Sequence, residues 1–229
     1  MSATPPSDRP GAPPTGATAA ALYSGDAGAA DLRIPPTTPG MRIGLFGGSF
    51  NPPHAGHVHV AETALARLGL DRVWMMVTPG NPLKDRGALA PLGRRIAAAR
   101  TLTHNPRVVV TAFEASLGAT YSWQTVARLV RAHPQVRFVW VMGADNLASF
   151  HRWQHWRRIA SAMPIAIVDR PGSTLAALSC RAGRALDRYR LAEADARSLA
   201  DHAAPAWVFV HAPRVPISSS ALRADGHRL

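Results

Sequence analysis

Two histidines three residues apart carry the clearest chemical signal in this sequence. His54 and His57 stand in the run GGSFNPPHAGH, which covers residues 47–57. Imidazole nitrogens donate hydrogen bonds to phosphate oxygens, and this spacing across a helix start lets both rings face one pocket. The glycines allow backbone N–H groups to approach an anion, and a helix beginning near Gly56 directs its positive dipole end to the same place. The run therefore predicts a phosphate-binding loop.

A second segment with related chemistry lies near the end of the chain, where Ser218, Ser219 and Arg223 stand close together. Serine is a favoured helix N-cap, and an arginine one turn into the helix can hold phosphate oxygens through two hydrogen bonds. Taken alone, the segment also fits an ordinary capped terminal helix. Its pairing with the first loop favours phosphate binding. Neither segment matches the P-loop pattern or the GxGxxG dinucleotide fingerprint.

The chain around these segments alternates strand-like and helix-like stretches. We expect strands over residues 41–47, 71–78, 107–111, 136–142, 165–169 and 207–210, helices over 56–69, 92–103, 121–132 and 146–160, and a short helix starting near Ser218. This alternation predicts an α/β, Rossmann-like fold with an open, mainly parallel sheet and helices on both faces. The loop after the first strand would then lie at the carboxyl edge of the sheet, where such sheets bind ligands.

Two other stretches complete the expected organisation. Residues 1–40 are rich in small residues and proline and contain few large apolar side chains. Such a segment cannot bury enough surface to offset its ordering entropy, so we expect a disordered tail followed by one domain over residues 41–229. Residues 173–203 carry apolar residues at three- and four-residue steps. This pattern predicts an amphipathic helix that packs on the domain, with a subunit-contact helix as the alternative.

Composition narrows the classes of partner and the cellular compartment. The formal net charge of +12 favours acidic partners, but the charges are scattered along the chain, which argues against a nucleic-acid interface. No apolar run approaches the roughly 18 residues that a membrane-spanning helix needs. Cys180 is the only cysteine, so an internal disulfide is excluded. With no signal-peptide pattern at the N-terminus, we expect a cytoplasmic protein.

Several further stretches occur in the same order as in one known family. They are TPGNPLK at 78–84, Glu114 followed by YSWQT at 121–125, GAD at 143–145 with Trp153, RPG at 170–172 and ISSSALR at 217–223. Together with the first loop they resemble the HxGH-type nucleotidyltransferases, most closely the bacterial nicotinate-nucleotide adenylyltransferases. The resemblance implies an enzyme that transfers AMP from ATP to nicotinate mononucleotide, giving nicotinate adenine dinucleotide and pyrophosphate. It also implies Mg²⁺, held mainly by phosphate and water rather than by protein ligands.

The resemblance assigns roles to individual residues. The catalytic residues would be His54, His57 and Arg223. The residues that bind ATP would be Gly47, Gly48, Ser49, Phe50, Gly56, Gly143, Asp145, Ser218 and Ser219. The residues that bind the pyridine nucleotide would be Asn51, Lys84, Tyr121, Ser122 and Trp153. Two positions depart from the family pattern, since Leu83 replaces a common histidine and Ser122 replaces a usual threonine.

Other interpretations stay open at this point. The same loops fit adenylyl transfer to nicotinamide mononucleotide or phosphopantetheine, and the preference for an acid rests on the turn at Tyr121 and Ser122. Trp153 also fits a core position, Lys84 a solvated surface position and Asp145 a helix N-cap. A basic nucleic-acid-binding module and a nucleotide sensor without turnover are alternatives from different classes. A homo-oligomer is also left open.

Overall fold

The computed structural model describes residues 26–80, 89–170, 174–213, 215, 217–224, 226 and 229. Its centre is a sheet of six parallel strands in the order β3-β2-β1-β4-β5-β6. The strands are β1 (Arg42–Gly48), β2 (Arg72–Val77), β3 (Val108–Thr111), β4 (Arg137–Gly143), β5 (Ile165–Val168) and β6 (Trp207–Val210). Each is a nearly continuous apolar run, as expected for strands covered on both faces. The expected α/β fold with an open parallel sheet is confirmed.

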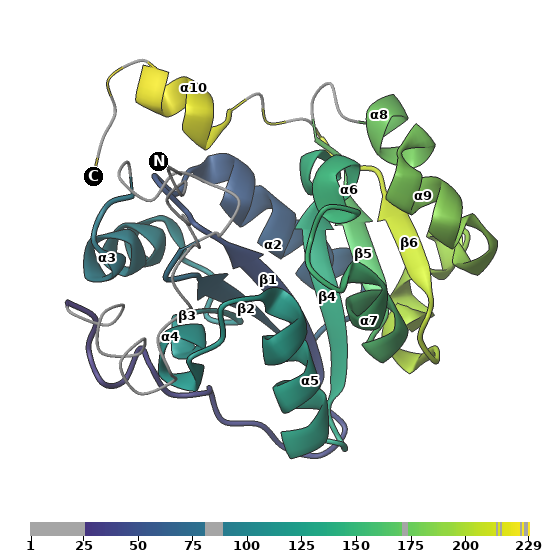
Figure 1. Cartoon of the computed structure of the whole chain (residues 1–229), viewed down its shortest axis with the longest axis horizontal. Helices are drawn as coiled ribbons and strands as arrows, with labels where there is room; N and C mark the ends of the chain where they lie inside the picture. The colour runs from purple at the N-terminus through teal and green to yellow at the C-terminus, as the bar shows by residue number, and fades with distance from the viewer. Residues whose placement is uncertain are drawn as a thin grey trace, which may run out of the picture.

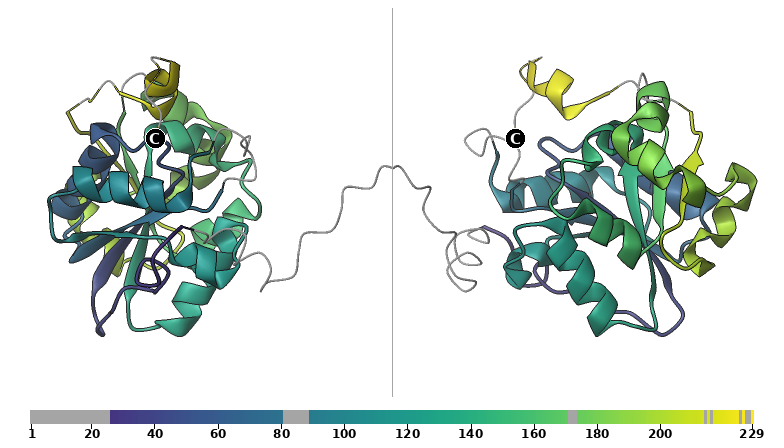
Figure 2. Two further views of the ribbon diagram at one scale, coloured as in Figure 1. Left: turned by 90° about the vertical axis from the view of Figure 1, so that its left-hand side faces the viewer. Right: turned by 45° about the vertical axis from the view of Figure 1, so that its right-hand side comes forward.

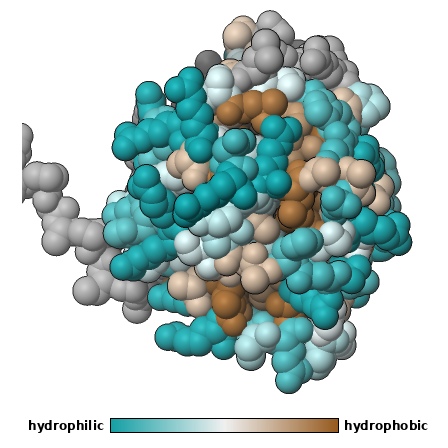
Figure 3. Space-filling view, turned by 90° about the vertical axis from the view of Figure 1, so that its right-hand side faces the viewer, coloured by the Kyte–Doolittle hydropathy of each residue, from teal (hydrophilic) through white to brown (hydrophobic). Residues whose placement is uncertain are grey.

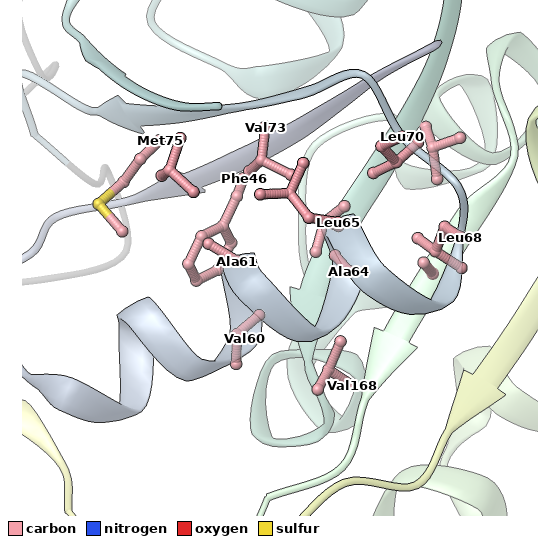
Figure 4. Close-up of a cluster of buried hydrophobic side chains, with 14 of the residues drawn as sticks. Phe46, Val60, Ala61, Ala64, Leu65, Leu68, Leu70, Val73, Met75 and Val168 are labelled. Carbon is pink, nitrogen blue, oxygen red and sulfur yellow. The ribbon is translucent and has the colours of Figure 1, made fainter. Parts of the chain in front are cut away.

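Helices cover both faces of the sheet (Figures 1 and 2). One face carries α2 (Ala55–Arg67), α3 (Leu92–Leu102) and the 3₁₀ helix η2 (Glu193–Asp201). The other carries α4 (Phe113–Leu117), α5 (Ser122–Ala132), α6 (Ala144–Phe150), α7 (Trp156–Ala162), α8 (Thr174–Ser179) and α9 (Arg181–Leu186). Successive strand residues alternate between the two cores, so that Phe46 packs with the α2 side and Leu45 with the α5 side. Figure 4 shows Ala61 and Leu65 of α2 packed toward Phe46 and Val73 of the sheet.

The strand order reverses between β1 and β4, because the chain runs outward from β1 to β3 and then returns to the other side of β1. Ligands bind at such a switch point, beyond the carboxyl ends of the strands. The first loop begins with the last two residues of β1, and Gly143–Asp145 spans the junction between β4 and α6. The topology therefore places two of the predicted binding segments beside each other.

Residues 26–40 differ from the expected tail, because they are folded against the domain. The main-chain carbonyl of Asp31 accepts hydrogen bonds from the N–H of Ala112 at 2.8 Å and from Thr111 Oγ1 at 3.2 Å. Leu32 packs against one core and Ile34 against the other. The segment has too few apolar residues for a core of its own, but it can use the core of the domain. In Figure 1 it runs below α4 and α5 before it enters β1. Residues 1–25 of the expected tail lie outside the described residues.

Two expected helices are interrupted. The stretch 146–160 forms α6 and α7 instead of one helix, separated by a turn in which His155 adopts a φ of 50°. The stretch 173–203 forms α8, α9, the 3₁₀ helix η1 (Asp187–Tyr189) and η2 instead of one amphipathic helix. Cys180 begins a new helix there, because its sulfur accepts the N–H of Gly183 at 3.2 Å. Further along, Leu191 N–H donates to the carbonyl of Trp207 in β6, and this hydrogen bond replaces a helical one.

Several apolar residues of this interrupted stretch are buried in the chain's own cores. Ala177, Ala182 and Leu186 pack on one face of the sheet, and Ala196 and Leu199 on the other. The side of the molecule that carries α8 and α9 is mostly hydrophilic, with separate small apolar areas (Figure 3). The periodicity therefore reflects packing within the chain. Within the described part of the chain, no helix has both the length and the apolar character needed to cross a bilayer.

Candidate active site

A cavity of ≈ 500 Å³ lies at the carboxyl edge of the sheet. Its size falls within the range of small-molecule binding pockets. The final helix α10 (Ser219–Ala224) lies across this end of the sheet (Figure 1). The predicted site residues that line the cavity are Gly47, Gly48, Ser49, Phe50, His54, His57, Tyr121, Ser122, Gly143, Asp145, Trp153, Ser218, Ser219 and Arg223.

The two histidines form a stacked pair at the start of α2. His54 is the N-cap residue, and its backbone N–H donates to Nδ1 of His57 at 3.2 Å. The ring centroids are 3.8 Å apart. Because Nδ1 of His57 accepts a hydrogen bond, the proton of that ring lies on Nε2, which makes Nε2 a donor. Burial, with a smaller contribution from the positive charge of Arg170, lowers the pKa of His54 to about 4. His54 is therefore neutral at neutral pH.

Gly48 and Gly56 stand at positions in this loop where a Cβ atom would be crowded by neighbouring side chains. A Cβ on Gly48 would lie 3.1 Å from the ring of Phe50, which is buried and packs edge-on against His57 at 4.8 Å. A Cβ on Gly56 would lie 3.0 Å from Nδ1 of His54 and 3.2 Å from the side chain of Ile217. Glycine at position 56 thus lets the first loop and the C-terminal segment approach each other.

The C-terminal segment is fastened to the first loop by hydrogen bonds. Ser219 Oγ donates to the carbonyl of Pro52 at 2.9 Å, and the guanidinium of Arg223 donates to the carbonyl of Asn51. Ser218 Oγ accepts the N–H of Ala221 at 3.2 Å, which is the expected capping contact. Two segments that lie far apart in the sequence therefore share one wall of the cavity.

Arg170 connects this wall to the start of α6. Its Nη2 donates to the carbonyl of Ile217 at 2.8 Å, and its Nε lies 3.8 Å from Asp145 Oδ1. A Cβ on Gly143 would lie 2.5 Å from that same carboxylate oxygen, so only glycine leaves room for Asp145. The Asp145 side chain is about half exposed and lines the cavity. A carboxylate in this position can accept hydrogen bonds from ribose hydroxyls.

An aromatic and polar wall closes the opposite side. Trp153 packs edge-on against Trp140 at 6.2 Å and Phe150 at 5.4 Å, and it also lines the cavity. Packing and ligand stacking are therefore compatible at this residue. At the start of α5, Gln124 Oε1 accepts the N–H of Tyr121 at 3.1 Å. That N–H is used within the protein, whereas the N–H groups of Ser122 and Trp123, the first two residues of α5, have no acceptor within the helix.

A carboxyl group is buried beneath the same wall. Glu114 is 5% exposed, and its Oε1 accepts a hydrogen bond from Thr125 Oγ1 at 2.8 Å. Burial raises its pKa to about 7, and the bond from Thr125 opposes this rise. Glu114 belongs to one of the stretches that carry the family resemblance, but the resemblance assigned it no role. Its burial depends on how α4 and α5 pack, which no local pattern reports.

Two of the predicted residues that the structure describes, Asn51 and Gly56, are absent from the cavity lining. Asn51 is buried, and its Oδ1 accepts the N–H of Ala90 at 3.2 Å. Gly56 is buried beneath His54. Lys84 lies outside the described residues. Conversely, the cavity is also lined by Arg152 and Gln154, which were not among the predicted site residues. Both flank Trp153 in the sequence, and this position next to a predicted site residue is the one feature of the sequence that could have indicated them.

The described residues offer no cluster of three or more His, Cys, Asp or Glu side chains that could hold a metal ion. The carboxyl groups at the cavity are Glu114, which is buried, and Asp145, which lies beside Arg170. This donor set does not fit a dedicated protein cage for Mg²⁺.

Comparison with known proteins agrees with this geometry. The cytidylyltransferase-like family model matches residues 45–225. A protein of Rhizobium meliloti named "Probable nicotinate-nucleotide adenylyltransferase" is 61% identical over 184 residues, which are 80% of this chain and 98% of the relative. A protein of Methylorubrum extorquens with the same name is 58% identical over 183 residues, covering 80% and 99%.

Solved structures agree on the fold. Plasmodium falciparum nicotinic acid mononucleotide adenylyltransferase complexed with NaAD superposes with a TM-score of 0.61 at 15% identity, covering 80% of this chain and 83% of that one. The same enzyme complexed with APC gives a TM-score of 0.58. The fold, the two joined loops and relatives of this identity lead to one conclusion: the chain belongs to the nicotinate-nucleotide adenylyltransferase family of cytidylyltransferase-like enzymes.

Proposed function

We propose that this enzyme transfers the AMP group of ATP to the 5′-phosphate of nicotinate mononucleotide, giving nicotinate adenine dinucleotide and pyrophosphate. The observation that carries the proposal is the meeting of the His54–His57 loop with the Arg223 segment on one wall of a cavity that also holds Asp145 and Trp153. This set provides donors for a triphosphate, an acceptor for ribose and a flat surface for a pyridine ring.

The reaction is an in-line displacement at the α-phosphorus. An oxygen of the mononucleotide phosphate forms the new P–O bond while the bond to the β-phosphate bridging oxygen breaks and pyrophosphate leaves. The attacking phosphate is already ionised at neutral pH, so no strong general base is required. Catalysis then comes from positioning and from stabilising the developing negative charge.

Each wall has a part in this scheme. His57 donates from Nε2 to the phosphates where charge develops, and the neutral ring of His54 supports it by stacking. Arg223, with Ser218 and Ser219, holds the departing pyrophosphate. The glycines of the first loop, with Ser49 and Phe50, shape the cradle for the remaining phosphate oxygens. Mg²⁺ would enter as the ATP complex, with phosphate oxygens and water as its ligands.

The acceptor side favours an acid. Trp153 presents a face on which the pyridine ring can stack, and Arg152 lines the same cavity with a positive charge. Ser122 N–H adds a backbone donor. A cation and an N–H donor attract the carboxylate of nicotinate more strongly than the neutral amide of nicotinamide. The resemblance also assigns Lys84 to the pyridine nucleotide. The lone Cys180 fits an enzyme of the reducing cytoplasm.

The test is a pyrophosphate-release assay with ATP and Mg²⁺, in which nicotinate mononucleotide, nicotinamide mononucleotide and phosphopantetheine are compared, and the dinucleotide is identified by mass. We expect the highest kcat/KM with nicotinate mononucleotide. Faster turnover of either other acceptor would reassign the substrate. Product formation with none of them, together with salt-sensitive binding of DNA or RNA, would replace the enzymatic proposal by nucleic-acid binding.

A further inference from the structure

One buried arginine touches the nucleotide loop from behind. Arg95 of α3 is 1% exposed and is absent from the cavity lining. Its Nη1 donates to the carbonyl of Ser49 at 2.8 Å and to the carbonyl of Thr78 at 2.7 Å, while its Nε donates to the carbonyl of Ala90 at 2.8 Å. Ser49 follows β1, Thr78 follows β2, and both line the cavity. A single guanidinium therefore joins the carboxyl ends of two neighbouring strands.

The direction of these hydrogen bonds matters for a phosphate site. Carbonyl oxygens repel phosphate, whereas backbone N–H groups attract it, so an anion-binding loop must keep its carbonyls turned away. The carbonyls of Ser49 and Thr78 point toward a guanidinium that lies outside the cavity. Thr78 N–H in turn donates to the carbonyl of Gly48 at 2.9 Å. The carbonyls of three cavity-lining residues, Gly48, Ser49 and Thr78, are thus engaged within the protein.

Burying a charged side chain costs free energy, and here its hydrogen bonds to main-chain carbonyls offset that cost. Burial lowers the pKa of Arg95 to about 10, which keeps the guanidinium charged at neutral pH. Hydrogen bonds from a charged donor are stronger than neutral ones, so each carbonyl is held firmly. Methionine or leucine would fill this position at a lower desolvation cost, and neither could hold the two strand ends.

The segment 26–40, which we call the strap, reaches this arginine from outside. Asp26 Oδ1 accepts the N–H of Gly93, in the first turn of α3, at 2.8 Å, and its negative charge favours the charged form of Arg95. A Cβ on Gly93 would lie 2.2 Å from the carbonyl oxygen of Asp26, so only glycine admits the strap here. Further along the strap, Asp31 pairs with Arg100 at the other end of α3. The strap therefore contacts α3 at both ends.

From these contacts we propose that Arg95 is a positioning residue for ATP, which holds the carbonyls of Ser49 and Thr78 away from the phosphates and is supported by Asp26 of the strap. This rests on the proposed function, because it assigns the triphosphate to the first loop. Arg95 acts through the loop and does not touch the substrate.

The test compares Arg95→Lys and Arg95→Met with Ile96→Val, a control that removes one buried methyl group from the neighbouring position of α3. We measure kcat and KM for both substrates, the Kd of ATP alone by calorimetry, and the folded fraction by circular dichroism. Loss of hydrogen bonds from a charged donor predicts a fall of about 10- to 100-fold in kcat/KM for ATP in Arg95→Met, and a matching rise in the Kd of ATP. Arg95→Lys, which keeps a charged donor, should fall between Arg95→Met and the wild type. The KM of the mononucleotide should stay within about threefold in all variants.

A purely structural Arg95 gives a different result. Arg95→Lys would then lose stability as Ile96→Val does and keep normal kcat/KM and Kd for ATP, which overturns the proposal. If Arg95→Met does not fold, Arg95→Lys decides. If the wild-type protein binds ATP but forms no dinucleotide, the proposed reaction fails and the Kd of ATP still decides the role of Arg95.

The strap is tested by Asp26→Asn, which can still accept the N–H of Gly93 but lacks the charge. We expect a fall of about two- to fivefold in kcat/KM for ATP, the size of an exposed charge interaction. The double variant Asp26→Asn with Arg95→Met should be no worse than Arg95→Met alone, because Asp26 acts through Arg95. Fully additive losses would remove the strap from the proposal.

Discussion

Replacement of Glu114 by glutamine should stabilise the protein at alkaline pH. The stability of Glu114→Gln minus that of the wild type should be larger at alkaline pH than at acidic pH. The carboxyl of Glu114 is buried beneath the cavity and accepts one hydrogen bond from Thr125. Glutamine has the same shape, and its Oε1 can accept the same bond. The substitution therefore removes the titration of the side chain with little change in packing.

The magnitude follows from the pKa of the group. Burial raises that pKa from 4.5 to about 7. Below the lower value the carboxyl is protonated in both the folded and the unfolded chain, so it carries no penalty. As pH rises through the window between these values, the unfolded chain releases the proton first, and the free energy of unfolding falls. Above the folded-state pKa the loss is complete and amounts to about 3 kcal/mol.

The measurement is urea unfolding of the wild type and Glu114→Gln at about pH 4 and about pH 8.5, which lie outside the window on either side. The stability of Glu114→Gln minus that of the wild type should rise by about 3 kcal/mol between the two conditions. Glu62→Gln on the exposed side of α2 is the control, and it should change this quantity by less than about 0.5 kcal/mol. A difference for Glu114→Gln that is equal at both pH values would refute the reasoning.

Four further outcomes test the cavity. His57→Ala should lower kcat by about 100-fold or more, as loss of a donor to developing charge does, and a near-normal kcat in steady-state assays would remove its catalytic role. Trp153→Ala should raise the KM of the mononucleotide by about tenfold while leaving that of ATP nearly unchanged, as expected for a lost stacking contact; a lower thermal midpoint with normal kinetics would leave Trp153 with packing only. His54 should titrate near pH 4 by NMR in the ligand-free protein. Because the ordinary pKa of histidine is 6.5, the stability that the neutral ring contributes is fully present above pH 6.5 and is lost as the pH falls toward 4. Arg170→Gln should raise that midpoint, and a His54 midpoint of 6.5 in the wild type would contradict its burial.

The strands and the two loop segments that we propose bind phosphate carry local signals, so the sequence could indicate them. Continuous apolar runs mark strands that are covered on both faces, and the run at 42–48 ends in glycines where the loop begins. The types of His54, His57 and Arg223 already limited the chemistry to an anionic ligand. Their order along the chain also fitted one family.

Helix boundaries were less predictable where a turn competes with helical periodicity. The residues from 146 to 160 have helical spacing, yet His155 takes a left-handed conformation and begins a new helix. Residues 173–203 have helical spacing as well, yet Cys180 is the N-cap of a new helix and accepts the N–H of Gly183. Further along, Leu191 N–H donates to the carbonyl of Trp207 in β6. The His155 turn and the Cys180 cap are local features that compete with a weak helical preference, and only the Leu191 bond comes from a segment distant in sequence.

By itself the sequence determined the strands, the two loops and the class of chemistry, because each of these depends on residues within one turn or one strand. Tertiary structure decided which distant groups share a site: the guanidinium of Arg223 and the carbonyl of Asn51 are 172 positions apart in the chain. It also decided that Asp26 supports Arg95 and that Glu114 is buried. These contacts exist because packing both faces of one sheet brings separate segments together, and the free energy of that packing is a sum over the whole core that no local pattern contains.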